Sequence, residues 1–198
     1  MRTKAIALLL TLTLISTLSV ATAQPPPPRP VAINEIAWAG TAASSFDEWM
    51  ELKNNTDKEI DITDWVLVSK DGTPNIKLKG KIPAKGFFLL ERTDDNAVSD
   101  IKADQIYTGG LLNAGETLTL KDNKGTVIDT ANNDGGPWPA GTASDGNPPY
   151  ATMERVDSIA PDTDANWKSN DGKKINGKDA KGKPLNGTPK AENSAVKK

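Results

Sequence analysis

The sequence predicts an all-β protein, an immunoglobulin-like β-sandwich with an N-terminal signal peptide before it and a polar C-terminal tail after it. Three observations indicate this fold class. Short segments alternate apolar and polar side chains, turn residues recur about every ten residues, and no segment has the period of an amphipathic helix.

The first predicted strands lie in the N-terminal half of the sandwich. Residues 31–36 (VAINEI) have the composition of a strand, and residues 49–53 (WMELK) alternate as a half-buried strand does. Ile60 and Ile62 flank Asp61 in a third short run. Residues 65–68 (WVLV) are more continuously apolar than the other runs.

Further strands follow at turn signals. An Asp-Gly turn precedes residues 76–79 (IKLK), and a Pro-Ala-Lys-Gly turn precedes residues 87–90 (FFLL). Residues 117–120 (TLTL) alternate cleanly. The sequence DNKG at 122–125 then predicts a hairpin turn into a strand at 127–128.

Beyond this hairpin the pattern weakens. Residues 135–149 are too rich in Gly and Pro for a ladder, and residues 151–156 are the last predicted strand. We therefore place the sandwich at residues 31–167 and a polar Lys/Gly/Asn-rich closing segment and tail at 168–198. The net charge is −10 for residues 24–167 and +6 for the tail, a polarity that the near-neutral total conceals.

Residues 1–23 have the features of a secretory signal. Arg2 and Lys4 precede an uncharged apolar stretch, and Ala-Thr-Ala at 21–23 fits a signal-peptidase site, so we expect cleavage before Gln24. The alternative is an uncleaved membrane anchor. Residues 24–30 (QPPPPRP) are predicted to form a proline-rich linker.

The chain contains no cysteine and no histidine. This excludes disulfides, thiol nucleophiles, Ser-His-Asp triads and the usual zinc sites. Export without cysteine favours a prokaryotic protein that is secreted, periplasmic or attached to the cell envelope, because small secreted eukaryotic domains usually rely on disulfides.

Several segments, taken in order, resemble a known family. They are VAINEIAW at 31–38, DEWMEL at 47–52, ITDWVL at 62–67, IPAKGFFLLER at 82–92, LNAGETLTL at 112–120, MER at 153–155, NW at 166–167 and NGTP at 186–189. Together they resemble the lamin-tail domains of secreted bacterial and archaeal proteins. One departure is Lys190, because the family often has Gly after the closing Thr-Pro.

The resemblance implies an immunoglobulin-like β-sandwich of the lamin-tail type, used for binding or tethering. Animal lamins carry this domain after a coiled-coil rod, but this chain has no heptad segment and no prenylation box. Filament and nuclear functions therefore do not transfer from the family.

Carboxylates of the first two strands form the first candidate cluster. Glu35, Glu48 and Glu51 could serve as an acid-base or cation site. We favour structural ion pairs of these glutamates with Arg92 and Arg155, because charge-assisted pairs satisfy polar groups near a core.

Acidic loops offer a weaker candidate, a calcium site. Such a site would use Asp94, Asp95, Asp100 and Asp104, but the spacing of an EF-hand is absent. We favour solvated loops, and we expect no metal and no cofactor.

Tryptophans and lysines are the candidate binding residues. Trp38, Trp138 and Trp167 lie at strand ends or in loops, where they could stack on a ligand or fold back onto the sandwich. Lys173 and Lys174 begin a lysine-rich stretch that could contact a polyanion or form a flexible tail.

We therefore expect a non-catalytic module whose partner is a surface protein or polymer that the sequence does not identify. No nucleophile elbow, S-x-x-K or P-loop motif is present. One alternative is a binder of DNA or a wall polymer through the basic tail, although nucleic acid is not favoured. The other is a carboxylate-based hydrolase. After signal cleavage, no membrane span is expected.

Overall fold

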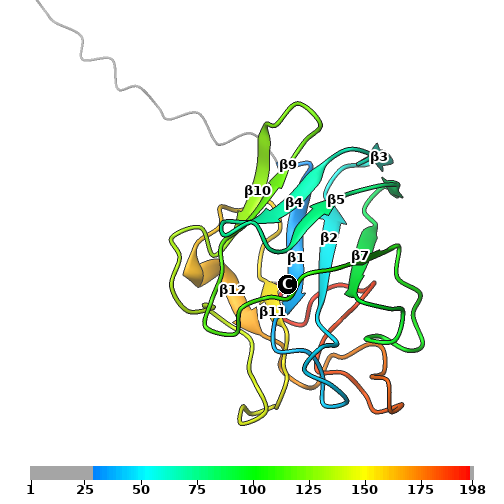
Figure 1. Cartoon of the computed structure of the whole chain (residues 1–198), viewed down its shortest axis with the longest axis vertical. Helices are drawn as coiled ribbons and strands as arrows, with labels where there is room; N and C mark the ends of the chain where they lie inside the picture. Colours follow the sequence, from blue (N-terminus) through cyan, green and yellow to red (C-terminus); the bar gives the residue numbers. More distant parts are fainter. Residues whose placement is uncertain (1–28, 197–198) are drawn as a thin grey trace, which may run out of the picture.

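Twelve β-strands and one short 3-10 helix (Asp164–Asn166) form the fold in the computed structural model, which describes residues 29–196 (Figure 1). The expected signal peptide and most of the linker lie outside these residues. The strands are β1 (Val31–Ala37), β2 (Trp49–Asn54), β3 (Ile60–Asp61), β4 (Val66–Ser69), β5 (Asn75–Lys77), β6 (Lys81–Ile82), β7 (Phe87–Arg92), β8 (Gln105–Tyr107), β9 (Leu118–Lys121), β10 (Val127–Ala131), β11 (Met153–Arg155) and β12 (Trp167–Ser169).

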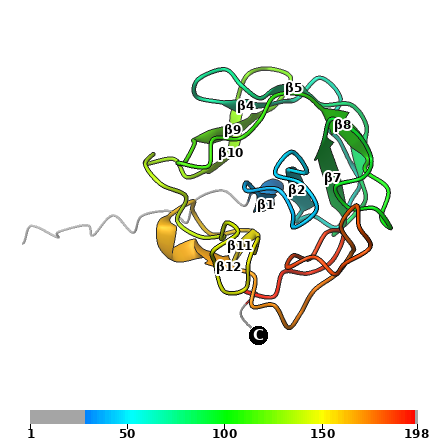
Figure 2. The same ribbon diagram turned by 60° about the horizontal axis from the view of Figure 1, so that its bottom comes forward.

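Two sheets pack face to face and confirm the predicted β-sandwich (Figure 2). One sheet has six strands in the order β12-β11-β1-β2-β7-β8, and the other has four in the order β10-β9-β4-β5. Strands β3 and β6 form a separate two-stranded ladder. The main core lies between the sheets and includes Ile33, Ile36, Met50, Leu67 and Leu120.

An irregularity in β1 decides which side chains enter this core. Ile33 pairs with Leu52, but the next pair is Glu35 with Glu51, so Asn34 is the extra residue of a β-bulge. In a regular strand, Ile33 and Glu35 would face the same side. The bulge lets Ile33 and Ile36 enter the core while Glu35 faces the other side of the sheet.

The predicted hairpin is the connection between β9 and β10. The Asp122 carboxylate accepts hydrogen bonds from the N–H groups of Lys124 and Thr126, and Gly125 has a positive φ of 83°. The turn thus bonds to its own backbone, as Asp and Gly favour. β9 then pairs with β4, so Leu118 and Leu120 face the core.

One margin of the sandwich is closed by a side chain. β8 pairs in parallel with β7 and is the last strand of its sheet. The Gln105 side chain donates to the Lys77 carbonyl oxygen and accepts from the Lys79 N–H, both at 2.9 Å. These bonds connect β8 to the β5 region of the opposite sheet, so the edge is not left open.

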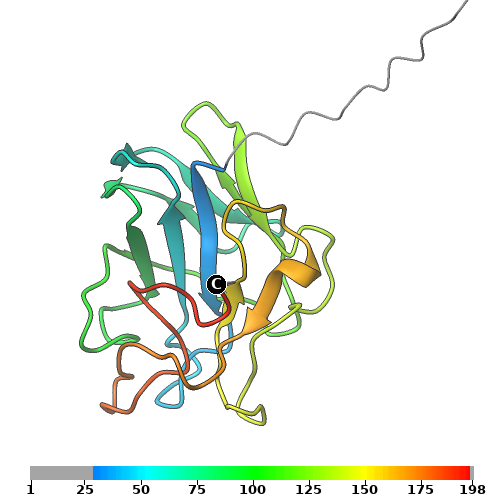
Figure 3. The same cartoon turned by 180° about the vertical axis from the view of Figure 1, so that it is seen from behind.

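The closing segment is a third layer on the sandwich, and the boundary expected after residue 167 falls inside β12. Trp167–Ser169 forms β12, and the last part of the chain, residues 188–194, lies over the outer face of β1, β2 and β11 (Figure 3). Several of these residues are buried, including Asp179, Leu185, Thr188 and Asn193. Part of the segment is polar because it bonds to a polar sheet face, while its lysines are exposed to solvent.

A buried ion pair connects the two sheets. The Arg155 guanidinium of β11 donates to the Asp129 carboxylate of β10 at 2.8 Å, and neither side chain is exposed. Arg155 also donates to the Ile33 carbonyl oxygen, while Asp129 accepts from the Ile33 N–H. The Trp167 ring lies 4.4 Å from the guanidinium carbon and covers it.

Most strands follow the alternation in the sequence, with three exceptions. The strands that sequence analysis missed are β6, β8 and β12, none longer than three residues. Residues 135–149 contain no strand, as their Gly and Pro content predicted. Within the described residues, no helix is long and apolar enough to cross a membrane.

The ion pair between the sheets predicts a large stability effect. Arg155→Met leaves the Asp129 carboxylate buried with Arg29 as its remaining cationic partner. We expect the free energy of unfolding to fall by about 3 kcal/mol in urea titrations, because one oxygen of the buried Asp129 loses its cationic donor and the Ile33 and Thr130 carbonyl oxygens lose theirs.

The control is Lys81→Met, which breaks an exposed ion pair with Glu59. Exposed pairs contribute little, so we expect a loss below about 0.5 kcal/mol. If Arg155→Met unfolds at the same urea concentration as Lys81→Met, the two sheets do not depend on the buried pair.

Candidate functional site

Three glutamates form a row across the centre of the six-stranded sheet. Glu35 of β1 is the direct cross-strand partner of Glu154 on β11 and of Glu51 on β2. All three side chains are fully buried. They occupy the outer face of the sheet, beneath the segment of residues 170–196, and we call them the glutamate row.

The closing segment supplies most of the hydrogen-bond donors for this row. Thr188 donates its N–H to Glu35 at 2.7 Å, and its hydroxyl lies 2.8 Å from Glu35 and 3.1 Å from Glu154. The Lys190 N–H donates to Glu51 at 2.6 Å. Lys190 has a φ of 58°, the left-handed region in which glycine is favoured, which accounts for the glycine of the family pattern.

Further bonds fix the segment to the sheet. Asn193 donates to the carbonyl oxygens of Asn34 and Arg155, and Ser194 donates its hydroxyl to Glu154 at 2.6 Å. Asn170 also donates to Glu154. The glutamate row is therefore covered by neutral donors, not by cations.

Burial without a cation changes the acidity of the row. Burial first, and then the negative charge of Glu154, raises the pKa of Glu35 from 4.5 to about 8. Burial and the neighbouring Glu35 hold the pKa of Glu51 well above its usual range. Glu35 is therefore mostly protonated at neutral pH, which relieves the repulsion between adjacent carboxylates.

One of the expected ion pairs is present, that of Glu48 with Arg92, whereas the pairs expected for Glu35 and Glu51 are replaced by other contacts. Glu35 and Glu51 bond to hydroxyl, amide and backbone N–H groups instead of Arg92 or Arg155. Arg92 pairs with Glu48 at 3.0 Å, and Arg155 pairs with Asp129. Arg155 does not reach the glutamate row because its side chain faces the inner side of the sheet, where it meets Asp129 of β10.

The candidate tryptophans lie inside the fold rather than on a binding platform. Trp38 and Trp138 stack on one another with ring centroids 6.4 Å apart, and both are buried. Their ring N–H groups donate to the carbonyl oxygens of Ala140 and Leu112. Trp167 is buried against Arg155. Folding these rings onto the sandwich removes their large apolar surface from water.

The four calcium candidates do not converge on one site. Asp94, Asp95 and Asp100 each accept a hydrogen bond from a different backbone N–H, of Asn96, Ala103 and Lys178 respectively. Asp104 accepts from Leu89 and pairs with Lys190. In residues 29–196, no group of three or more acidic side chains is placed to hold a metal ion.

The candidate lysines are on the surface of the folded segment. Lys173 and Lys174 are exposed, as are Lys178, Lys181 and Lys183. The Lys174 ammonium donates to the Asn193 carbonyl oxygen. These lysines are therefore held by an ordered layer instead of a flexible tail.

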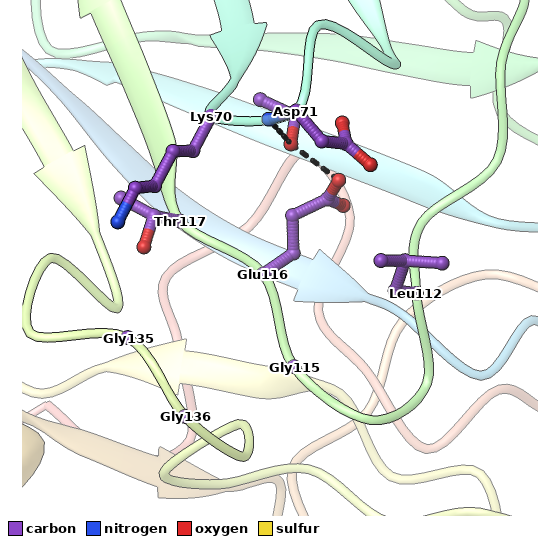
Figure 4. A pocket seen from close by; sticks show the side chains of 9 residues that line it. Lys70, Asp71, Leu112, Gly115, Glu116, Thr117, Gly135 and Gly136 are labelled. Carbon is purple, nitrogen blue, oxygen red and sulfur yellow. Dashed lines mark hydrogen bonds between the residues drawn. The ribbon is translucent and has the colours of Figure 1, made fainter.

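A pocket of about 460 Å³ lies where β4 ends and β9 begins (Figure 4). At its floor is Glu116, which is 6% exposed. The Ser69 hydroxyl donates to one oxygen of Glu116, whereas the other, Oε2, is buried with no hydrogen-bond partner in the described structure. The lining residues are Ser69, Lys70, Asp71, Leu112, Gly115, Glu116, Thr117, Gly135 and Gly136.

The walls of this pocket are fixed by Asn132. Its side-chain NH2 donates to the backbone carbonyl oxygens of Glu116 and Gly136, both at 3.1 Å, and its backbone carbonyl oxygen accepts from the Thr117 hydroxyl. A Cβ at Gly115, whose φ is 117°, would overlap the Gly136 carbonyl oxygen. Only glycine allows the two loops to approach this closely.

Sequence analysis did not select Glu116 or Thr188. A signal for Glu116 was present, because Leu118 and Leu120 face the core and the same alternation places Glu116 on that side. Thr188 lies in the NGTP segment that resembles the family, but no local pattern indicates which residue it contacts. Its position over Glu35 depends on a contact between residues 153 positions apart.

The glutamate row predicts an unusual pH dependence of stability. Glu35 has a higher pKa in the folded chain, about 8, than in the unfolded chain, near 4.5. Folding therefore favours the protonated form, and stability present at pH 5 is lost as the pH rises through 8. We expect the free energy of unfolding to fall by roughly 4 kcal/mol between pH 5 and pH 8.5.

Urea titrations of Glu35→Gln isolate this contribution. Glutamine keeps a hydrogen-bond acceptor and cannot ionise, so the variant should lose less stability than the wild type over this range. Glu59→Gln, at an exposed position, should leave the pH profile unchanged. A wild-type stability that is constant or rises from pH 5 to pH 8.5 would contradict the assignment.

Comparison with known families identifies the family of the fold. No curated protein sequence matches the chain. The profile of the Lamin Tail Domain family matches residues 24–134, more than half of the chain. That range includes β1 to β10 and Glu116, whereas Glu154 and Thr188 lie beyond it. The chain belongs to the lamin tail domain family.

Proposed function

We propose that this chain is an exported, non-catalytic module that binds or tethers a partner at the cell surface or in the extracellular space. The observation that carries the proposal is the surface pocket over Glu116, whose floor holds a buried carboxylate oxygen without a partner. Membership of the lamin tail domain family agrees with a binding module of the immunoglobulin-like class.

The carboxylates considered for hydrolysis are already used by the fold. Both oxygens of Glu51 accept hydrogen bonds beneath the closing segment. Glu48 accepts from Arg92 and from the Leu111 N–H, and burial raises its pKa to about 7. A carboxylate pair for hydrolysis requires access to substrate and water, which the position of Glu51 does not provide.

Export is proposed from residues 1–23, which have a basic start, an apolar stretch and a small-x-small cleavage site. We expect the mature chain to begin at Gln24, detected by N-terminal sequencing of protein from outside the cytoplasm. Ala21→Leu combined with Ala23→Leu should block cleavage, because both small side chains are replaced.

Thr22→Leu is the matched control, since the position between the two small residues carries no size requirement, and cleavage should continue. Mature protein that still carries residues 1–23 outside the cytoplasm would contradict the signal assignment and favour an uncleaved anchor.

Binding is tested with the labelled mature chain, residues 24–198, and isolated cell envelopes from the source organism. We expect saturable retention that unlabelled protein displaces, because a module with a defined site has a finite number of partners. Retention that rises linearly with concentration, or is unchanged by unlabelled protein, would contradict a binding function.

A basic surface favours a second candidate, contact with a polyanion. Lys173, Lys174 and Lys178 are exposed on the ordered closing segment. In the envelope assay, this candidate requires retention to fall steeply with salt and with Lys173→Glu combined with Lys174→Glu. Deletion of residues 168–198 is unsuitable as a test because it uncovers the glutamate row.

A further inference from the structure

We infer that the pocket over Glu116 is a receptor site for a lysine or arginine side chain of a partner protein. The inference rests on the proposed binding function and names the chemistry of the partner. A ligand for this pocket must supply a hydrogen-bond donor to Glu116 and fit the apolar and charged groups at the rim.

The first requirement comes from the floor of the pocket. Glu116 Oε1 accepts from Ser69, whereas Oε2 is buried and no group lies within hydrogen-bond geometry of it; the nearby Leu112 N–H lowers the pKa of Glu116 and the Asp71 carboxyl raises it. A buried carboxylate oxygen without a partner is unfavourable, so a donor brought by a ligand gains more here than at an exposed carboxylate. Burial also raises the pKa of Glu116, which a cationic ligand would reverse.

Charge favours a cationic donor over a neutral one. Asp71 places a second carboxylate at the rim, and its charge acts on Glu116 in the same sense as burial. Lys70 is the one cation lining the pocket, and Figure 4 shows its side chain directed away from Glu116, beside Thr117. With Glu116 ionised, the two carboxylates and the one lysine give the lining of the pocket a net charge of −1.

An apolar rim favours a cation that is carried on an alkyl stem. Leu112 is 53% exposed and lines the pocket beside Glu116 (Figure 4). Lysine and arginine bury their methylene stems along apolar surface while the charged head reaches a polar group. A lysine or arginine whose methylenes pack on Leu112 and whose charged group bonds to Glu116 uses both the apolar rim and the acidic floor of the pocket.

The pocket is formed before a ligand arrives. Asn132 joins the loop that carries Glu116 to the loop that carries Gly136, and the approach of Gly115 to Gly136 excludes any side chain between them. A rigid site loses little conformational entropy on binding, which favours recognition of a single side chain.

The test uses NMR titration of the mature chain with three probes whose side chains each have an unbranched alkyl stem. These are the N-acetyl, N-methylamide derivatives of lysine, arginine and norleucine, with spermidine as a free polyamine. We expect the amide signals of Ser69, Gly115 and Thr117 to shift with the lysine or arginine probe. Norleucine, which lacks the charge, should bind at least about tenfold more weakly.

Variants then assign the contact to the two carboxylates. Glu116→Gln should weaken the cationic probe about tenfold or more, while glutamine keeps an acceptor for Ser69. Asp71→Asn, at an exposed rim position that cannot disturb the core, should weaken it severalfold. Asp164→Asn, an exposed acid in the 3-10 helix, is the matched control and should leave binding unchanged.

Several results would overturn the inference. They are equal binding of norleucine, shifts confined to residues outside the pocket, binding of spermidine without either amino-acid probe, or unchanged affinity in both Glu116→Gln and Asp71→Asn. If Glu116→Gln retains full binding to envelopes, the pocket assignment fails while the binding function stands. If the wild type shows no saturable envelope binding, the proposed function itself fails.

Discussion

Three carboxyl groups buried side by side are the constraint on which the outer half of this structure depends. Glu154, Glu35 and Glu51 occupy adjacent strands with no cation among their hydrogen-bond partners. Such a row is stable in a folded protein only if donors cover it and part of it is protonated. The closing segment supplies hydroxyl, amide and backbone donors, and this explains why it is polar and yet ordered.

The sequence predicts the sandwich well because its strands obey a local rule. Leu118 and Leu120 alternate with threonines, and the turn at Asp122 bonds to itself, so neither needs distant contacts to be recognised. β8 has no such local pattern. Its residues Gln105–Tyr107 form a strand because β7 lies beside them and because the Gln105 amide reaches the other sheet.

The candidate site was only partly predictable, for a related reason. Arg155 was identified as a structural cation, but its partner depends on topology. β10 brings Asp129 to the inner face of the sheet, and the bulge at Asn34 turns Glu35 to the outer face. The one-residue bulge in β1 therefore places Glu35 and Arg155 on opposite faces of the sheet, although their opposite charges led us to expect a pair. The low hydrophobicity of residues 168–196 led us to place them outside the sandwich. They fold onto it nevertheless, because the sheet face that they meet is itself polar.

The two groups of buried carboxylates differ in a way that distinguishes stability from binding. In the glutamate row, Glu35 and Glu51 have bonded oxygens, and the closing segment excludes outside ligands. Glu116 has one bonded oxygen and one without a partner, beneath a pocket whose walls are fixed by Asn132. Folding alone would favour a neutral residue at this position, because the second oxygen is desolvated without compensation. A partner that donates a hydrogen bond to this oxygen would offset the desolvation cost. Of the two groups of carboxylates, Glu116 is therefore the one suited to recognise a partner.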